Sequence, residues 1–193
     1  MPATPTADAI LDCARASIIA GGYNGFSYAD IAAVVGIRKA SIHHHFPTKV
    51  DLVRTLVQRY RAEATAGMAE SVGAVTDPVA RLRGYTDYWA ACIGAPETSY
   101  CLCALLATQI PVLPDEVADE VRAYFLALSD WLTTTLETGV TQGIFSLPGS
   151  ARAEAEVFMA TVHGAMLSAR AHGDPALFAT IADSAIDRLR AHS

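Results

Sequence analysis

Residues 38–49 gather side chains that can bind phosphate and read the edges of nucleic-acid bases. Cationic and hydrogen-bonding side chains of these types supply most protein contacts to DNA phosphates and base edges. They act together only when one exposed face of a helix presents them. The candidate contacts in this segment are Arg38, Lys39, Ser41, His43, His44 and Lys49.

Two short helices joined at Gly36 are predicted to present these side chains. Ser27 and Asp30 form a capping-box pattern that starts the first helix, and Gly36 can take the left-handed conformation that ends it. Pro47 ends the second helix. The apolar residues that face inward at helical spacing are Ile31, Val35, Ile37, Ile42 and Phe46. This pattern is typical of a helix-turn-helix DNA-binding element, and a solvated helical hairpin is the alternative.

The run from Phe26 to Lys49 resembles the DNA-binding signature of the TetR family of transcriptional repressors, and the resemblance covers about residues 7–60. It implies that Lys49 holds a backbone phosphate. It also implies phosphate contacts by Ser27 and Tyr28 at the start of a helix, where backbone N–H groups favour anions. The family usually has tyrosine where this chain has His43, so a shorter, titratable imidazole replaces a phenol.

The charge of the chain is unevenly distributed. The whole chain carries a net charge of −6, which by itself argues against nucleic acid. Residues 1–60 hold six Lys or Arg and four Asp or Glu, a net charge of +2, whereas residues 61–193 hold eight and sixteen, a net charge of −8. A basic segment on an acidic chain favours DNA contact confined to the N-terminal region.

Composition sets the broad class of protein. With 52% apolar and 18% charged residues the chain can bury a sizeable core. No apolar run approaches the roughly 20 residues that span a bilayer, and the N-terminus lacks the basic and apolar regions of a signal peptide. We therefore expect a cytoplasmic protein, without a membrane partner, whose four cysteines are reduced.

The fold class predicted is all-α, with about nine helices. Residues 1–48 are predicted to form the helix-turn-helix DNA-binding domain, and residues 49–193 a helical domain that binds an effector and dimerises. Helix-ending and helix-starting residues punctuate the chain, with Asp77-Pro78 and Asp174-Pro175 as the clearest starts. The predicted helices cover about residues 7–20, two within 27–46, 48–72, 78–94, 100–109, 114–141, 150–171 and 175 onward.

The last two helices are predicted to form the interface of a two-fold homodimer. One head reads only a half-site, so two heads must be held about 34 Å apart to meet successive major grooves. The alternative is that these apolar faces pack only within one chain. The predicted interface residues are Phe158, Val162, Met166, Ala169, Phe178, Ile181 and Ala185.

A stripe on the helix at 78–94 is either core or one wall of a ligand cavity. Its members are Tyr85, Tyr88, Trp89 and Cys92, at helical spacing. Aromatic side chains with polar tips suit amphipathic small molecules. The resemblance implies that an inducer binds in this region and shifts the spacing of the DNA-binding heads. Further candidate wall residues are Leu105, Gln109, Phe125, Leu128, Trp131, Phe158 and His163.

Cys101 and Cys103 leave three interpretations open. Free cysteines are most often small buried hydrophobic residues. A helix N-terminus would lower the pKa of the Cys101 thiol, which would make a redox or electrophile sensor. A soft-metal site is the third interpretation. His43, His44 and His45 are consecutive, so on a helix they diverge and no metal site is predicted there.

The chain shows no nucleophile elbow, Walker loop, dinucleotide fingerprint or zinc motif, so neither an enzyme nor a cofactor is expected. The function predicted is a repressor that binds a palindromic operator as a dimer and is released by a small-molecule inducer. The alternatives are a thiol- or metal-sensing repressor acting through Cys101 and Cys103, a helical interaction protein without DNA binding, and a small helical enzyme.

Overall fold

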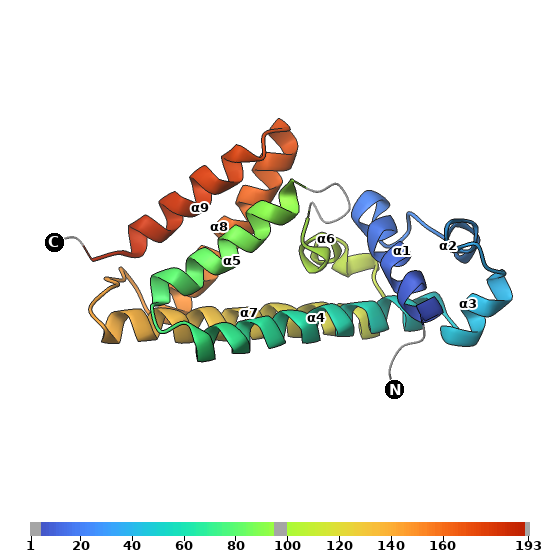
Figure 1. Ribbon diagram of the computed structural model, residues 1–193, viewed down its shortest axis with the longest axis horizontal. Coiled ribbons are helices and arrows are strands. Elements are labelled where there is room, and N and C mark those ends of the chain that lie inside the picture. Colours follow the sequence, from blue (N-terminus) through green and yellow to red (C-terminus); the bar gives the residue numbers. More distant parts are fainter. Residues whose placement is uncertain (1–4, 95–99, 192–193) are drawn as a thin grey trace. The chain divides into compact units, whose positions relative to one another are not determined.

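The computed structural model describes residues 5–94 and 100–191 and confirms the all-α class (Figure 1). Within these residues the ordered elements are helices, and one isolated antiparallel bridge joins Phe145 to Arg190. The short 3-10 helix was not predicted. The helices are α1 (Pro5–Gly21), α2 (Tyr28–Val35), α3 (Lys39–His45), α4 (Lys49–Ala74), α5 (Pro78–Ile93), α6 (Leu102–Ala107), η1 (Ile110–Val112), α7 (Asp115–Thr141), α8 (Ala151–His172) and α9 (Ala176–Leu189).

Helix boundaries follow the capping residues seen in the sequence. Asp77 caps α5 by accepting a hydrogen bond from Val79 N, and Pro78 occupies the first turn. Gly36 and Gly173 end α2 and α8 with φ of 74° and 65°, in the left-handed region where a side chain would be strained. Local sequence therefore sets most of the boundaries.

The chain divides into two compact units. Unit 1 comprises Met1–Glu63 and Tyr100–Tyr124, and unit 2 comprises Ala64–Ser99 and Phe125–Ser193. Both α4 and α7 contribute their first part to unit 1 and their second part to unit 2. The functional division predicted at residue 48 stays a prediction.

Unit 1 packs the predicted DNA-binding head together with α6 and the start of α7. α1 contacts α2, α3 and α6 within this unit. Its helices meet through apolar side chains that are almost fully removed from water, which is the main source of their stability. These include Ile10, Ile18, Ile31, Ile42, Leu52, Leu56, Leu102 and Leu106.

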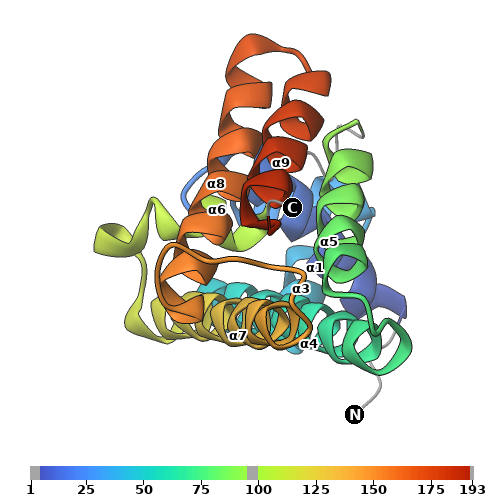
Figure 2. The same cartoon turned by 90° about the vertical axis from the view of Figure 1, so that its left-hand side faces the viewer.

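Unit 2 is built around the pair of α8 and α9. These helices lie side by side in both views, and α5 packs against α9 (Figures 1 and 2). Its buried side chains include Leu82, Trp89, Leu128, Leu132, Leu136, Phe158, Val162, Met166, Phe178 and Ile186. In the described ranges, no helix combines the length and the apolar character that crossing a bilayer requires.

Candidate DNA-binding surface and effector region

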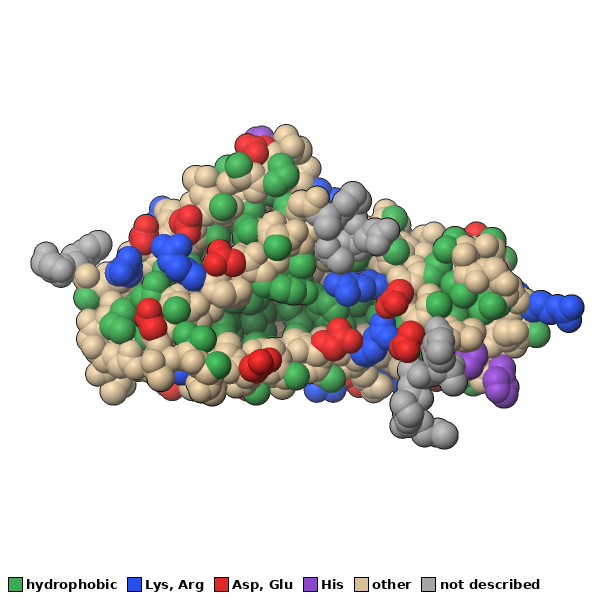
Figure 3. All heavy atoms as spheres, viewed as in Figure 1, with side chains coloured by type: hydrophobic (Ala, Val, Ile, Leu, Met, Phe, Trp, Pro, Cys, Tyr) green, Lys and Arg blue, Asp and Glu red, His purple; other side chains and the backbone are tan. Residues whose placement is uncertain are grey.

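α3 presents a cationic, hydrogen-bonding face to solvent. Ile42 is fully buried beneath it, whereas Arg38, Lys39, His43 and His44 are exposed. The Lys, Arg and His side chains stand out at the α2–α3 part of the surface (Figure 3). Ser41 is half-buried on the same short helix. These five predicted contact residues are therefore brought together, and their contacts with DNA stay predictions.

His43 is oriented by two neighbours. Its Nδ1 lies 3.1 Å from the carbonyl oxygen of Pro47, and its ring centroid lies 4.8 Å from that of Tyr28. Because a carbonyl oxygen only accepts, Nδ1 carries the hydrogen in this contact. In the neutral ring, Nε2 is then an acceptor that a donor on DNA can meet.

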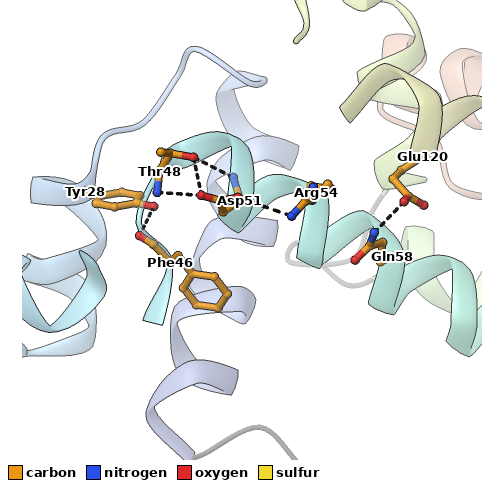
Figure 4. Close-up of polar contacts among 7 residues, drawn as sticks. All are labelled: Tyr28, Phe46, Thr48, Asp51, Arg54, Gln58 and Glu120. Atoms are coloured by element: carbon orange, nitrogen blue, oxygen red, sulfur yellow. Dashed lines mark hydrogen bonds and ion pairs between the residues drawn. The ribbon is translucent and has the colours of Figure 1, made fainter. Parts of the chain in front are cut away.

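Tyr28 does not offer its hydroxyl to a phosphate. The side chain is buried and its hydroxyl donates to the carbonyl oxygen of Phe46 at 2.9 Å (Figure 4). Burial, with a smaller contribution from the Asp51 carboxylate, raises the pKa of Tyr28 to about 12. The hydroxyl of Tyr28 thus joins α2 to the end of α3, and the phosphate contact predicted for Tyr28 stays a prediction, with its backbone N–H as the remaining donor.

The hydroxyl of Ser27 caps α2. Its Oγ accepts from Ala29 N at 3.2 Å and donates to Asp30 Oδ2 at 2.8 Å, and Ser27 N also donates to Asp30. Hydrogen bonds from the Ser27 side chain and backbone lower the pKa of Asp30. The predicted capping box is confirmed.

Lys49 is tied to the loop that precedes α2. Its Nζ donates to the carbonyl oxygen of Phe26 at 2.5 Å and lies 4.0 Å from the Phe26 ring centroid and 5.0 Å from that of Tyr23. Burial lowers the pKa of the Lys49 ammonium. An ammonium has three donors, so two remain beyond the one that the Phe26 carbonyl accepts.

A second capping box starts α4. The Thr48 hydroxyl donates to Asp51 Oδ2 at 2.7 Å, and Asp51 N donates to Thr48 Oγ1 at 3.1 Å (Figure 4). Further along α4, Gln58 donates to Glu120 of α7 at 2.6 Å within the same unit. These contacts fix the direction in which α4 leaves the head.

Three of the six basic residues from Arg38 to Arg61 are neutralised by ion pairs inside unit 1. The pairs are Arg54–Asp51, Arg59–Asp8, Arg59–Asp12 and Arg61–Glu120, at 2.7–3.5 Å. Within the described ranges, Arg38 and Lys39 form no ion pair. The positive charge of this segment that no carboxylate neutralises therefore lies at the start of α3 and at Lys49, a narrower patch than the sequence suggested.

Gln109 lies in unit 1, against the turn that follows α1. Its Oε1 accepts a hydrogen bond from Tyr23 N at 2.8 Å, and its amide group fills the space that a Cβ on Gly22 would occupy. Leu105, one turn earlier, is half-buried in the same unit. Both residues were expected to line the effector cavity. Gln109 instead contacts the DNA-binding head, because α6 packs on α1.

Cys101 is a buried thiol in a polar cluster. It is 0% exposed, accepts hydrogen bonds from Tyr60 OH at 3.6 Å and Ala104 N at 3.4 Å, and donates to Tyr124 OH at 3.7 Å. Burial raises the pKa of Cys101 and raises that of Cys103 well above its usual value. The expected lowering at a helix start is therefore wrong, because desolvation outweighs the capping contact.

Metal chemistry finds little support in the geometry. Across residues 5–94 and 100–191, no group of three or more His, Cys, Asp or Glu side chains is arranged to hold an ion. The two other cysteines, Cys13 and Cys92, are half-buried, and none of these four cysteines forms a disulfide.

Aromatic residues of α5, α7 and α8 meet inside unit 2. The ring centroids of Tyr85 and Trp131 are 5.7 Å apart, and those of Phe125 and His163 are 5.4 Å apart. Trp89, Leu128 and Phe158 are each at most 2% exposed, so they belong to the packed interior. Tyr88 is 52% exposed and Cys92 half-buried, which places Tyr88 at the surface and not in an enclosed wall.

Four polar atoms in this interior have no hydrogen-bond partner among the described residues. They are Trp89 Nε1, Trp131 Nε1, Thr135 Oγ1 and His163 Nε2. Burial lowers the pKa of His163 to about 4, against a smaller opposing effect of its hydrogen bond to Met159. Thr135 was missed from the sequence, although its position four residues after Trp131 on an apolar helix face was a usable signal.

The predicted dimer interface needs correction. Phe158, Val162, Met166, Ala169 and Phe178 are at most 2% exposed within one chain, so they form core and cannot meet a partner. Ile181 and Ala185 are half-buried and line a groove on the outer side of α8 and α9, together with Val157 and Thr161. The exposed apolar or small residues of α8 repeat at heptad spacing instead: Val157, Ala160, Gly164, Leu167 and Ala171.

Comparison with known proteins gives a consistent family. Residues 10–56 match the family model described as bacterial regulatory proteins, tetR family, and residues 78–185 match the one described as tetracyclin repressor-like, C-terminal domain. A comparison with curated proteins gave no match.

Solved structures agree with this assignment. A transcriptional regulator of the TetR family from Agrobacterium tumefaciens is 60% identical, with 96% of this chain and 98% of that chain covered and a TM-score of 0.94. A TetR transcriptional regulator from Legionella pneumophila is 25% identical, with 98% and 100% covered and a TM-score of 0.87. A regulator from Saccharomonospora viridis in complex with choline shares the fold alone, at 20% identity, with 96% and 98% covered and a TM-score of 0.82.

Proposed function

Since this chain belongs to the TetR family of bacterial regulatory proteins, it is a DNA-binding transcriptional regulator and not an enzyme, and from that premise we propose how its own residues act. We propose that a homodimer binds a palindromic operator through two copies of α3 and leaves it when a small molecule binds in unit 2. We propose that it acts in the cytoplasm, where an operator would be accessible.

The DNA contact is proposed to come from the exposed face of α3. Arg38 and Lys39 offer charges that no carboxylate of the described residues neutralises, and His43 and His44 lie on the same short helix. Arginine and lysine at a helix start can reach phosphates or guanine, and imidazoles can reach base edges. This unpaired cationic face beside a buried Ile42 is the observation that carries the proposal.

Phosphate anchoring is proposed for Lys49 and for the backbone N–H groups at the start of α2. Lys49 keeps donors beyond the one that Phe26 accepts. The first N–H groups of a helix attract anions, and Ser27 caps only part of them. These anchors would fix the position of α3 in the groove without reading sequence.

Dimerisation is proposed through the outer face of α8 and α9. The heptad-spaced stripe on α8 exposes Val157 by 58% and Leu167 by 59%, and Gly164 lets a second helix approach closely. Exposed large apolar side chains in one stripe favour a protein interface. A two-fold axis at this stripe would give each operator half-site its own head.

The test is operator binding by the purified protein, measured by fluorescence anisotropy with DNA from the intergenic regions beside its gene. The double variant Arg38→Ala, Lys39→Ala is expected to weaken binding by at least about 30-fold, because two phosphate or base contacts are lost per head. Arg122→Ala removes another exposed charge, which pairs with Asp119 nearby, and is expected to bind as the wild type. Equal loss in both variants would show that general charge, and not α3, binds the DNA.

A further inference from the structure

We propose that the effector is an uncharged, largely apolar molecule that carries hydrogen-bond acceptors, and that Trp89, Trp131, Thr135 and His163 are the polar groups that bind it. This inference rests on the proposed function, since it names the ligand class of the same regulator. It concerns unit 2 alone.

The unpartnered atoms are the first support. Trp89 is 2% and Thr135 0% exposed, yet the indole N–H and the hydroxyl have no acceptor among the described residues. Native proteins leave few buried polar atoms unpaired, because each costs free energy without a compensating contact. Four such atoms in one unit indicate groups kept for a ligand.

Placement on three neighbouring helices is the second support. Trp131 and Thr135 lie one turn apart on the same face of α7. Trp89 lies one turn after Tyr85 on α5, whose ring contacts Trp131. A hollow floored by hydrophobic side chains opens between α5 and the second half of α4, in the same unit (Figure 3). The polar groups thus come from three helices whose aromatic side chains meet in unit 2, and one of these helices, α5, borders the hollow.

The donors and acceptors of these four side chains determine which polar groups the ligand must carry. Each indole can only donate, so Trp89 and Trp131 require acceptors. His163 is hydrogen-bonded to the carbonyl of Met159 through one ring nitrogen, which leaves Nε2 as an acceptor in the neutral ring. The hydroxyl of Thr135 can act as a donor or as an acceptor. The matching ligand carries acceptor lone pairs for the indoles, which a single carbonyl oxygen can supply, and a donor to His163 would add a further contact.

Charge excludes ionised ligands. Burial keeps His163 neutral at pH 7, with its pKa lowered to about 4. Arg81, the buried cation in the described part of unit 2, donates to the carbonyl oxygens of Val75 and Val72. The same region buries no carboxylate. An ionised ligand would lose its hydration without a counter-charge, which costs more than the apolar contacts return.

The experiment uses four matched probes with the full-length protein and no DNA, measured by calorimetry. They are acetylnaphthalene (ketone), ethylnaphthalene (hydrocarbon), naphthoate (anion) and naphthylmethylammonium (cation), with choline as a second cation. The ketone is expected to bind about tenfold more tightly than the hydrocarbon, which corresponds to one to two net hydrogen bonds, and more tightly than either ion.

Two variants test whether Thr135 and Trp131 cause the preference for the ketone over the hydrocarbon. Thr135→Val and Trp131→Phe each remove a polar atom while keeping most of the apolar volume, and are expected to reduce the preference for the ketone to about twofold or less without weakening the hydrocarbon. Thr133→Val is the matched control, since its hydroxyl already donates to Ser129 O, and is expected to keep the full preference.

Three outcomes overturn the ligand class: no binding of the ketone by the wild type, tighter binding of an ion, or an unchanged preference in Thr135→Val. Operator binding of the same proteins is measured separately. Loss of DNA binding by the wild type refutes the proposed function and leaves the probe preference standing. Intact DNA binding with no probe preference refutes the ligand class alone.

Discussion

The side-chain oxygen of Gln109 accepts a 2.8 Å hydrogen bond from the backbone N–H of Tyr23. This contact joins the end of the α6–η1 segment to the turn that follows α1, within unit 1. Gly22 makes the close approach feasible, because a Cβ there would lie 2.1 Å from Gln109 Nε2 and the residue has a φ of 75°. The turn that leads to the DNA-binding helices is therefore held by a side chain 86 residues away.

Replacing Gln109 by Leu should destabilise the protein by about 1–3 kcal/mol, because the Tyr23 N–H loses its acceptor while remaining partly buried. Operator affinity should fall as the turn loosens. Urea denaturation measures the first effect, and hydrogen exchange at the Tyr23 amide reports the local one. Gln58→Leu is the control, since Gln58 is exposed and bonds only Glu120. Unchanged exchange at Tyr23 would contradict this role.

Lys49→Met separates a structural role from phosphate binding. The variant keeps an apolar stem against the rings of Tyr23 and Phe26 but removes the hydrogen bond to the Phe26 carbonyl, so stability should fall by about 1 kcal/mol. The salt dependence of operator binding should also become shallower by about one unit for each head if Lys49 meets a phosphate. Unchanged stability in urea would refute the tie to Phe26.

Acid should destabilise the wild type through His163. Its pKa is lowered to about 4 in the folded protein, against an ordinary value of 6.5. Between pH 6.5 and 4, His163 is protonated in the unfolded chain but stays neutral in the folded protein. The free energy of unfolding that is present above pH 6.5 is therefore lost as the pH falls towards 4. The loss at pH 5 should be about 1–2 kcal/mol.

The variant His163→Phe tests this assignment, since it cannot titrate and retains an aromatic ring beside Phe125. Denaturation curves at pH 7 and pH 5 should differ less for the variant than for the wild type. His172→Phe, an exposed histidine on the same helix, should behave as the wild type. An identical pH dependence in all three proteins would exclude His163 as the cause.

Leu167→Glu should convert the dimer to a monomer. Leu167 is 59% exposed in the heptad stripe of α8, and a carboxylate buried at a two-fold interface would lack a partner. Leu126→Glu on α7 is a matched control, because Leu126 is also 59% exposed. Analytical ultracentrifugation should show a monomer only for the first variant, with operator affinity at least about 100-fold weaker. Two intact dimers would place the interface elsewhere.

The cysteines should react according to burial. Cys13 and Cys92 are half-buried, whereas Cys101 and Cys103 are 0% exposed. Burial raises the pKa of Cys13 as well as those of Cys101 and Cys103, so exposure is what separates the two pairs. A thiol reagent should therefore modify the first two in the native protein and all four only after unfolding. Mass spectrometry locates the labels. Fast native labelling of Cys101, together with oxidant-driven operator release that Cys101→Ser abolishes, would instead support the thiol-sensing alternative.

The sequence by itself determined the helices and the DNA-binding head. Caps such as Ser27 with Asp30, and the stop at Gly36, act over three or four residues, so their effect can be predicted without knowing the rest of the fold. The inward position of Ile42 and the exposure of Lys39 follow from the period of a helix.

Only the tertiary structure decided which apolar face is core and which is free. Val162 and Leu167 lie on the same helix with similar hydrophobicity, yet one is fully buried and the other 59% exposed, because the neighbouring helices cover one side of α8. In the same way, long-range packing sends Gln109 to the Tyr23 turn and removes Cys101 from water. The periodicity of a helix shows that one of its faces is apolar, but residues far away in the chain determine which helix packs against that face.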